Sequence, residues 1–238
     1  MSEWKAKRFW TAAEVTEGAE GFGIALDGRP VKTPAKRALQ APTRALAEAI
    51  AAEWAAQGDV VDPLSMPFTR TANAAIDKVA VQQAEVAEML AAYGDSDLLC
   101  YRAEQPAELV ERQAAAWDPL LDWAAETLGA RLHPRVGVMH APQDPDALAR
   151  LSAEVKALPV FQLTAFHDLV SLSGSLILGF AAAQDLKTIK ALWDISRLDE
   201  IWQAEQWGQD EEAEAAAAVK FTAFQHAKAV FDLTHPGF

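Results

Sequence analysis

Cysteine is nearly absent from this sequence, with one residue, Cys100, among 238. A single cysteine excludes an internal disulfide and is typical of proteins from a reducing compartment. Cys100 lies in an apolar stretch, and the local sequence offers neither a base nor a helix N-terminus that would activate it as a nucleophile. We therefore expect a buried structural thiol.

Basic residues are few: 21 Lys and Arg stand against 34 Asp and Glu, for a formal net charge of −13. Such a chain is repelled by phosphate backbones and by anionic lipid, so nucleic acid and membrane surfaces are poor partners. A basic protein surface remains favourable, because complementary charge speeds encounter and selects partners. The charge balance favours a protein partner.

Long apolar runs are missing as well. The longest uncharged apolar stretch, residues 169–184, is interrupted by serines and glycines and is shorter than the roughly 20 residues that a bilayer span needs. We expect it to form a buried helical hairpin or a pair of core helices. The first ten residues are charged and have no apolar core like that of a secretory signal. We expect a cytoplasmic protein.

Motifs that hold phosphates or metals are also missing. No Gly-Lys-Ser or Gly-Lys-Thr occurs, which excludes a P-loop. The glycines between residues 18 and 28 lie in a strand-like region and do not lead into a helix, so they cannot cradle a phosphate. No two of the five histidines lie three to five residues apart, as zinc ligands on one helix or turn would. We expect no cofactor and no metal.

Carboxylates leave one enzymatic alternative open. Asp95 with Asp97, or Asp199 with Glu200, could serve as the paired acids of a hydrolase. Adjacent residues of a helix point apart, however, so such a site would need partners that the sequence does not announce. We expect a protein that is not an enzyme, and keep a carboxylate-based hydrolase as the alternative.

The first forty residues have the pattern of β-strands. Apolar and small residues alternate from Phe22 to Leu26, and Asp27-Gly28 supplies the positive-φ pair of a tight hairpin turn. The other strands that we expect in this antiparallel sheet cover residues 31–33, 8–15 and 37–41.

After residue 42 the apolar period becomes that of a helix. Thr43 as N-cap and Gly58 as C-cap predict an amphipathic helix between them. Pro119 should kink or split a later helix, over residues 106–129. The remaining helices that we expect cover residues 71–93 and 144–158, two segments between 160 and 183, residues 185–207 and residues 210–233.

These elements predict an α+β fold. A small N-terminal α+β domain with an antiparallel sheet, residues 1–95, is followed by a larger all-helical C-terminal domain, residues 96–238.

A glutamate continues an apolar stripe late in the chain. Leu198, Ile201, Trp202 and Glu205 recur at spacings of three and four, so they share one face of the expected helix. Either this is a core stripe whose glutamate pairs with an Arg or Lys of the same chain, or the face is offered to a partner. Trp193, Trp202 and Trp207 cluster along the same predicted element, and aromatic residues beside a charge are typical of interface anchors as well as of cores.

Ordered landmarks across nearly the whole chain resemble those of a known family, the ATP12 assembly chaperones that attend the α subunit of F-type ATP synthase. The landmarks are residues 7–10 (KRFW), 26–34 (LDGRPVKTP), 66–67, 72–77 (ANAAID), 97–103 (DLLCYRA), 117–121 (WDPLL), 163–165, 174–175, 198–200 (LDE), 203, 205 and 207–208.

The resemblance implies an α+β N-terminal domain and a helical C-terminal domain. It implies binding, without catalysis, of the unassembled α subunit, whose exposed apolar surface would otherwise aggregate, until the β subunit replaces the chaperone. It also implies a monomer in a bacterial cytoplasm, or in the mitochondrial matrix for eukaryotic relatives. An interaction module with another client is the remaining alternative. The predicted partner-binding residues are Glu205, Trp202, Asp199 and Trp207.

Overall fold

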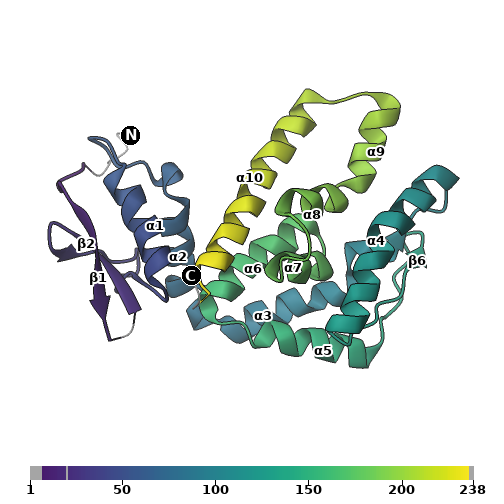
Figure 1. Ribbon diagram of the computed structural model, residues 1–238, viewed down its shortest axis with the longest axis horizontal. Coiled ribbons are helices and arrows are strands. Elements are labelled where there is room, and N and C mark those ends of the chain that lie inside the picture. The colour runs from purple at the N-terminus through teal and green to yellow at the C-terminus, as the bar shows by residue number, and fades with distance from the viewer. Residues whose placement is uncertain (1–6, 20, 236–238) are drawn as a thin grey trace. The chain divides into compact units, whose positions relative to one another are not determined.

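The computed structural model describes residues 7–19 and 21–235 (Figure 1). An antiparallel sheet near the N-terminus precedes a long series of α-helices, which confirms the predicted α+β class. The chain forms two compact units. Unit 1 comprises Met1–Gln83, Pro159–Ala165 and Ala229–Phe238, and unit 2 comprises Ala84–Leu158 and Phe166–Lys228. The predicted domain boundary between residues 95 and 96 stays a prediction.

The sheet of unit 1 is built around the predicted hairpin. β1 (Ala13–Gly18) pairs antiparallel with β2 (Gly21–Leu26), which also pairs with β3 (Arg29–Pro30) and β4 (Gln40–Ala41). The turn between β2 and β3 is confirmed, because Asp27 has φ +46° and Gly28 has φ +77°.

The turn residue Asp27 also holds the irregular segment that precedes β1. Its carboxylate accepts hydrogen bonds from the backbone N–H groups of Ala12, at 2.8 Å, and Thr11, at 3.0 Å. These bonds lower the pKa of Asp27, because they favour the charged form. Asp27 therefore has two roles: its backbone forms the turn, and its side chain binds the segment before β1.

α1 (Arg44–Ala55) packs on the sheet, and its predicted N-cap is confirmed. The Thr43 hydroxyl accepts from the Leu46 N–H at 3.3 Å. The predicted glycine C-cap at Gly58 is wrong, since Ala56 closes the helix. The Arg8 guanidinium donates to the Ala55 carbonyl at 3.2 Å and to that of Gln57, so a distant side chain satisfies this helix end.

The predicted single helix over residues 71–93 is wrong. α2 (Pro67–Asp77) and α3 (Gln83–Ala91) are separated by a 3₁₀ turn, Val79–Val81. At the end of α2 the Asp77 carboxylate accepts from the Thr33 hydroxyl at 2.7 Å and from the Ala35 N–H at 2.9 Å. This contact fastens the end of α2 to the loop after β3, and Lys78 at φ −117°, ψ −63° closes the helix.

Unit 2 is helical apart from one short parallel ladder, in which β5 (Tyr101–Arg102) pairs with β6 (Arg135–Val136). No helix in the described part of the chain is long and apolar enough to cross a membrane. The helices that lie wholly or mainly in unit 2, besides α3, are α4 (Ala107–Thr127), α5 (Pro145–Lys156), α6 (Val160–Ser173), α7 (Leu176–Ala183), α8 (Ile189–Ser196), α9 (Leu198–Trp207) and α10 (Glu211–Leu233). 3₁₀ turns at Ala92–Ser96 and Leu98–Cys100 lie between α3 and β5, and a third, Pro63–Ser65, precedes α2 in unit 1.

The core of unit 2 confirms several predicted helices. α6 and α7 are the two predicted apolar helices, and every residue from Leu176 to Ala182 is buried. Pro119 does not split α4, because Trp117, Leu120 and Leu121 beside it are all buried and tertiary packing holds the helix together. Gly129, at φ +64°, follows the end of α4 as predicted.

The predicted helix over residues 185–207 is also wrong, because it consists of α8 and α9. The Ser196 hydroxyl donates to the Trp193 carbonyl at 2.7 Å, and Arg197 leaves the helical conformation at φ −108°, ψ 17°. The predicted tryptophan cluster on one element is therefore wrong. Trp193 is buried against Phe221 of α10, whereas the other two tryptophans lie on α9.

Candidate functional site

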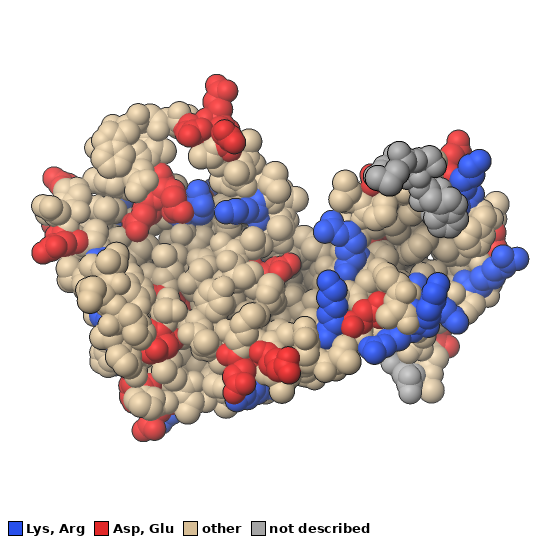
Figure 2. All heavy atoms as spheres, turned by 180° about the vertical axis from the view of Figure 1, so that it is seen from behind, with Lys and Arg blue, Asp and Glu red and all other residues tan. Residues whose placement is uncertain are grey.

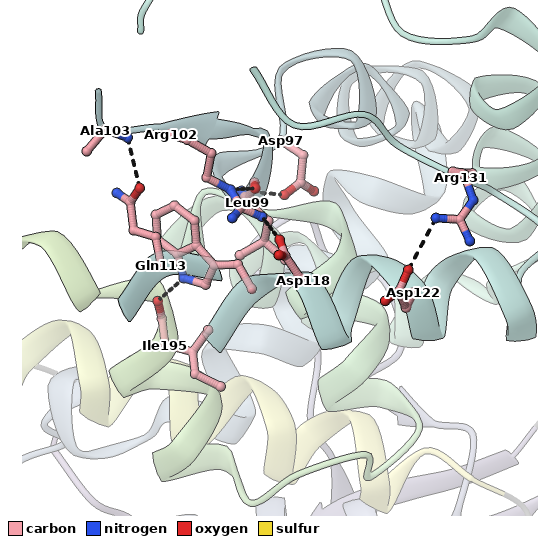
Figure 3. A network of polar contacts seen from close by, with 10 residues as sticks. Asp97, Leu99, Arg102, Ala103, Gln113, Asp118, Asp122, Arg131 and Ile195 are labelled. Atoms are coloured by element: carbon pink, nitrogen blue, oxygen red, sulfur yellow. Dashed lines mark hydrogen bonds and ion pairs between the residues drawn. The ribbon is translucent and has the colours of Figure 1, made fainter. Parts of the chain in front are cut away.

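A polar network beside α4 holds the first turns of unit 2 together (Figure 3). Arg102 donates from Nε to the Leu99 carbonyl at 2.8 Å and from its terminal nitrogen to Asp118 at 2.7 Å. Its guanidinium also lies 5.2 Å from the centre of the Trp117 ring. Arg102 thus joins the segment before β5 to the middle of α4.

Asp97 is a fully buried carboxylate in the same region. Its two oxygens accept from the backbone N–H groups of Leu99 and Ile177, each at 3.0 Å, so one side chain joins two segments. Burial raises the pKa of Asp97 to about 6, although hydrogen bonds from Ser175 and from backbone N–H groups oppose this rise. Asp97 therefore has a structural role, because its carboxylate links these two segments.

The thiol of Cys100 is buried, as predicted. Burial, followed by the charge of Asp97, raises the pKa of the Cys100 thiol to about 12. At neutral pH the group is a thiol without nucleophilic character.

Helix α9 presents two of the predicted partner-binding carboxylates to α4. Asp199 accepts from the Gln113 side-chain amide at 2.7 Å, while the oxygen of that amide accepts from the Ala103 N–H at 2.8 Å. One turn and a half further along, Glu205 accepts from both terminal nitrogens of Arg112, at 2.5 and 3.0 Å. Neighbouring residues of α4 therefore contact both acids.

The pair of Arg112 and Glu205 lies at the surface. The side chains are 37% and 48% exposed, and the hydrogen bond from Arg112 lowers the pKa of Glu205. The sequence left open whether Glu205 pairs with an Arg or Lys of its own chain or is offered to a partner, and the structure contains the pair within the chain. An exposed pair of this kind contributes little to stability, because solvent screens it, so Glu205 can exchange its partner at little cost.

Two tryptophans accompany these acids. Trp202 is half-buried, with the Arg112 guanidinium 5.8 Å from its ring centre, whereas Trp207 is 80% exposed at the end of α9. We call the four predicted residues of this helix, Asp199, Trp202, Glu205 and Trp207, the α9 face. Its role in binding stays a prediction.

A polar pocket of about 410 Å³ adjoins the α9 face within unit 2. It contains charges of both signs, including Arg197 and Glu200, which form an ion pair at 3.1 Å, and Lys220. Its other lining residues are Leu98, Trp117, Ser171, Leu172, Ser173, Gly174, Ser196, Asp199 and Gln203.

The contacts of the acids give the hydrolase alternative no support. Asp199 and Glu200 are engaged by different partners, Gln113 and Arg197. Asp97 is enclosed in the core by backbone N–H groups, away from the neighbouring Asp95, which accepts from a backbone N–H at 2.7 Å. Over residues 7–19 and 21–235, no group of three or more His, Cys, Asp or Glu could hold a metal ion.

Sequence reasoning did not identify Arg112 and Gln113 as the residues that contact the α9 face. They lie 93 and 86 residues before Glu205 and Asp199, respectively. The only local signal is the spacing of four between Gln113 and Trp117, which places both on the buried side of α4.

Charge is divided unequally between the two units. Unit 2 holds 23 of the 34 acidic residues and 11 of the 21 basic ones, a net charge of −12, so nearly all of the net charge lies in the unit of the α9 face. On the face shown in Figure 2, acidic side chains are scattered over a mostly uncharged surface, while basic side chains are most numerous on one side and also occur elsewhere. The fold and the site define a two-unit α+β protein with an acidic, aromatic-bearing helical surface.

Comparisons with known proteins identify its family. The model of the family described as ATP12 chaperone protein matches residues 7–125, half of the chain. The crystal structure of Atp12 from Paracoccus denitrificans has a TM-score of 0.95 and 51% identity, covering 98% of this chain and 100% of that one. A mutant of the P. denitrificans protein gives a TM-score of 0.96 and 50% identity, with the same coverage.

A more distant relative is the mitochondrial protein atp12 of Schizosaccharomyces pombe. It is 28% identical over 221 residues, which cover 87% of this chain and 75% of the relative. The chain therefore belongs to the ATP12 chaperone family, the assembly chaperones of the F1-ATPase, and the resemblance seen in the sequence landmarks is confirmed.

Proposed function

We propose that this protein binds the unassembled α subunit of F-type ATP synthase and shields its subunit interface until the β subunit replaces it. The observation that carries the proposal is the last part of α9, where the exchangeable carboxylate of Glu205 is followed two residues later by the exposed Trp207, in the acidic unit. Aromatic anchors beside charged groups are typical of protein interfaces. Membership of the ATP12 family supports a protein client.

The proposed exchange at Glu205 follows from the strength of its present contact. An exposed pair contributes little to stability, so a cation of the client can replace Arg112 without a large loss to the chaperone. Trp207, at the end of the same helix, supplies exposed apolar area. Binding of this kind needs no chemical step, and we propose that the protein acts as a monomer without catalysis, in the bacterial cytoplasm.

The test uses isolated α subunit of F-type ATP synthase and the charge reversal Glu205→Lys. We expect the wild-type protein to suppress aggregation of the α subunit and to co-purify with it. Glu205→Lys should lose both effects, because the new ammonium repels both Arg112 and a basic client.

Glu154→Lys is the matched control, since Glu154 is an exposed glutamate of α5 outside the α9 face. Circular dichroism should show both variants folded. Equal protection by wild type and Glu205→Lys would remove the α9 face from the proposal. Capture of a different main client would favour the interaction-module alternative, and turnover of nucleotide by the pure protein would contradict its non-catalytic part.

A further inference from the structure

The strand β6 has an open edge. In its parallel ladder with β5, the Gly137 N–H donates to the Arg102 carbonyl at 2.9 Å. The C=O and N–H of one trans peptide point in opposite directions, so the Val136 carbonyl points away from β5. In an extended strand the N–H of the same residue points the same way. Among the described residues, neither Val136 group has a hydrogen-bond partner.

Apolar side chains are exposed along the same segment. Val136 is 66% exposed, Val138 89% and Met139 81%. A single exposed apolar side chain needs no explanation, but three within four consecutive residues concentrate apolar surface in one short segment. Valine favours strand pairing, and methionine adapts its shape to different partners. The segment has both the backbone groups and the side chains of an acceptor for an added strand.

The segment is also locally basic within the acidic unit. Residues 131–143 contain no Asp or Glu. Arg131 forms an ion pair with Asp122 at 3.2 Å. Arg135 instead donates to the Pro142 carbonyl, and no carboxylate of the described residues lies within ion-pair distance of it. The positive charge of Arg135 is therefore available at this edge for a carboxylate of a partner.

We propose that the open edge at Val136 accepts an extended segment of the protein client by strand addition. The segment carries apolar side chains that meet Val138 and Met139, and an Asp or Glu that meets Arg135. Main-chain hydrogen bonds supply the affinity in this mode of recognition, and side chains select the partner. A second copy of this chain fits less well, because pairing two such edges would bring arginine close to arginine.

The inference rests on the proposed function and adds a second contact surface for the same client. It is distinct from the α9 face, because it is apolar and basic where that face is aromatic and acidic. The two surfaces can therefore be tested by separate variants.

The decisive variant is Val136→Pro, with Val136→Thr as its matched control. Proline removes the outward N–H but none of the bonds to β5, and edge strands tolerate proline at such positions. Threonine keeps the N–H and the β-branched shape. With isolated α subunit as the probe, we expect affinity to fall about tenfold in Val136→Pro and to stay within about twofold of wild type in Val136→Thr.

Hydrogen exchange at the Val136 amide provides a test that does not depend on folding of the variant. In the wild-type protein this amide should exchange quickly when free and at least about tenfold more slowly in the complex, because it gains a hydrogen bond. Arg135→Gln should also make binding less sensitive to salt.

The outcomes separate the two proposals. A wild-type protein that fails to bind the α subunit overturns the proposed function and the strand addition together. Equal binding by wild type and Val136→Pro, or unchanged exchange at Val136 in the complex, overturns strand addition alone. Loss of binding in Glu205→Lys with full binding in Val136→Pro would assign the client to the α9 face only.

Discussion

Raising the pH from 4 to 7.5 should weaken the folded state through one buried carboxyl group, Asp97. The pKa of this group is about 6 in the folded chain, against a reference value of 3.8. The folded state therefore holds the proton more tightly than the unfolded state. The stability that this proton contributes is fully present below pH 3.8 and is lost as the pH rises through about 6.

The difference between the two pKa values sets the size of the effect. At 1.36 kcal/mol per pKa unit the whole shift corresponds to about 3 kcal/mol. At pH 4 the unfolded carboxyl is already more than half ionised, so Asp97 should lower the free energy of unfolding by about 2 kcal/mol between pH 4 and pH 7.5. Solvent hardly screens the charge of Asp97, because the residue is 0% exposed, so this value needs little reduction. The charge remains tolerable at neutral pH because backbone N–H groups, including those of Leu99 and Ile177, donate to it.

The assay compares urea unfolding of the wild-type chain and Asp97→Asn at several pH values. Asparagine cannot titrate, so the stability of the variant contains no contribution from a proton at this position. It has only one acceptor oxygen, so it loses at least one of the hydrogen bonds that Asp97 accepts, and this loss in the variant does not depend on pH. The free energy of unfolding of the wild type minus that of the variant should fall by about 2 kcal/mol from pH 4 to pH 7.5. Glu154→Gln, at an exposed position, is the control. A difference that stays flat across this range would refute the reasoning.

Two further predictions concern the core of unit 2. Gly179→Ala should destabilise the chain by about 1–2 kcal/mol in urea unfolding, because the added Cβ would lie 2.7 Å from a methyl of Val170. Gly58→Ala, where nothing lies within 4 Å, should change stability by less than about 0.5 kcal/mol, and equal stability of the two variants would contradict the packing argument. Cys100, with a pKa of about 12, should resist iodoacetamide at pH 8 until the chain is unfolded in guanidinium, and rapid labelling of the folded chain would show that the thiol is accessible.

The landmarks that identified the family mostly hold the backbone together. Arg8 covers the end of α1, Asp77 fastens the loop after β3, and Asp97 joins two segments of unit 2. Each of these contacts satisfies backbone groups that would otherwise lack partners. The resemblance therefore predicted the fold and the family well, and the client-binding surface stays a prediction.

Local patterns were sufficient where the physical cause is local. The positive-φ pair at Asp27-Gly28 predicted the β2–β3 turn, and the Thr43 hydroxyl predicted the start of α1. The apolar run of residues 169–184 predicted the buried helices at α6 and α7. In each case the signal and the structure that it predicts lie within a few residues of each other.

Tertiary contacts decided the rest. The end of α2 is fastened to Thr33 through Asp77, although periodicity predicted one helix over residues 71–93. Packing around Pro119 keeps α4 continuous, although a proline was expected to kink or split it. The spacing of apolar residues was enough to place Glu205 on one face of a helix. It could not predict the contact with Arg112, which lies 93 residues earlier in the sequence. The open edge at Val136 likewise depends on which side of β6 faces β5. Sequence periodicity determines the face of an element, and only packing between distant segments determines what that face meets.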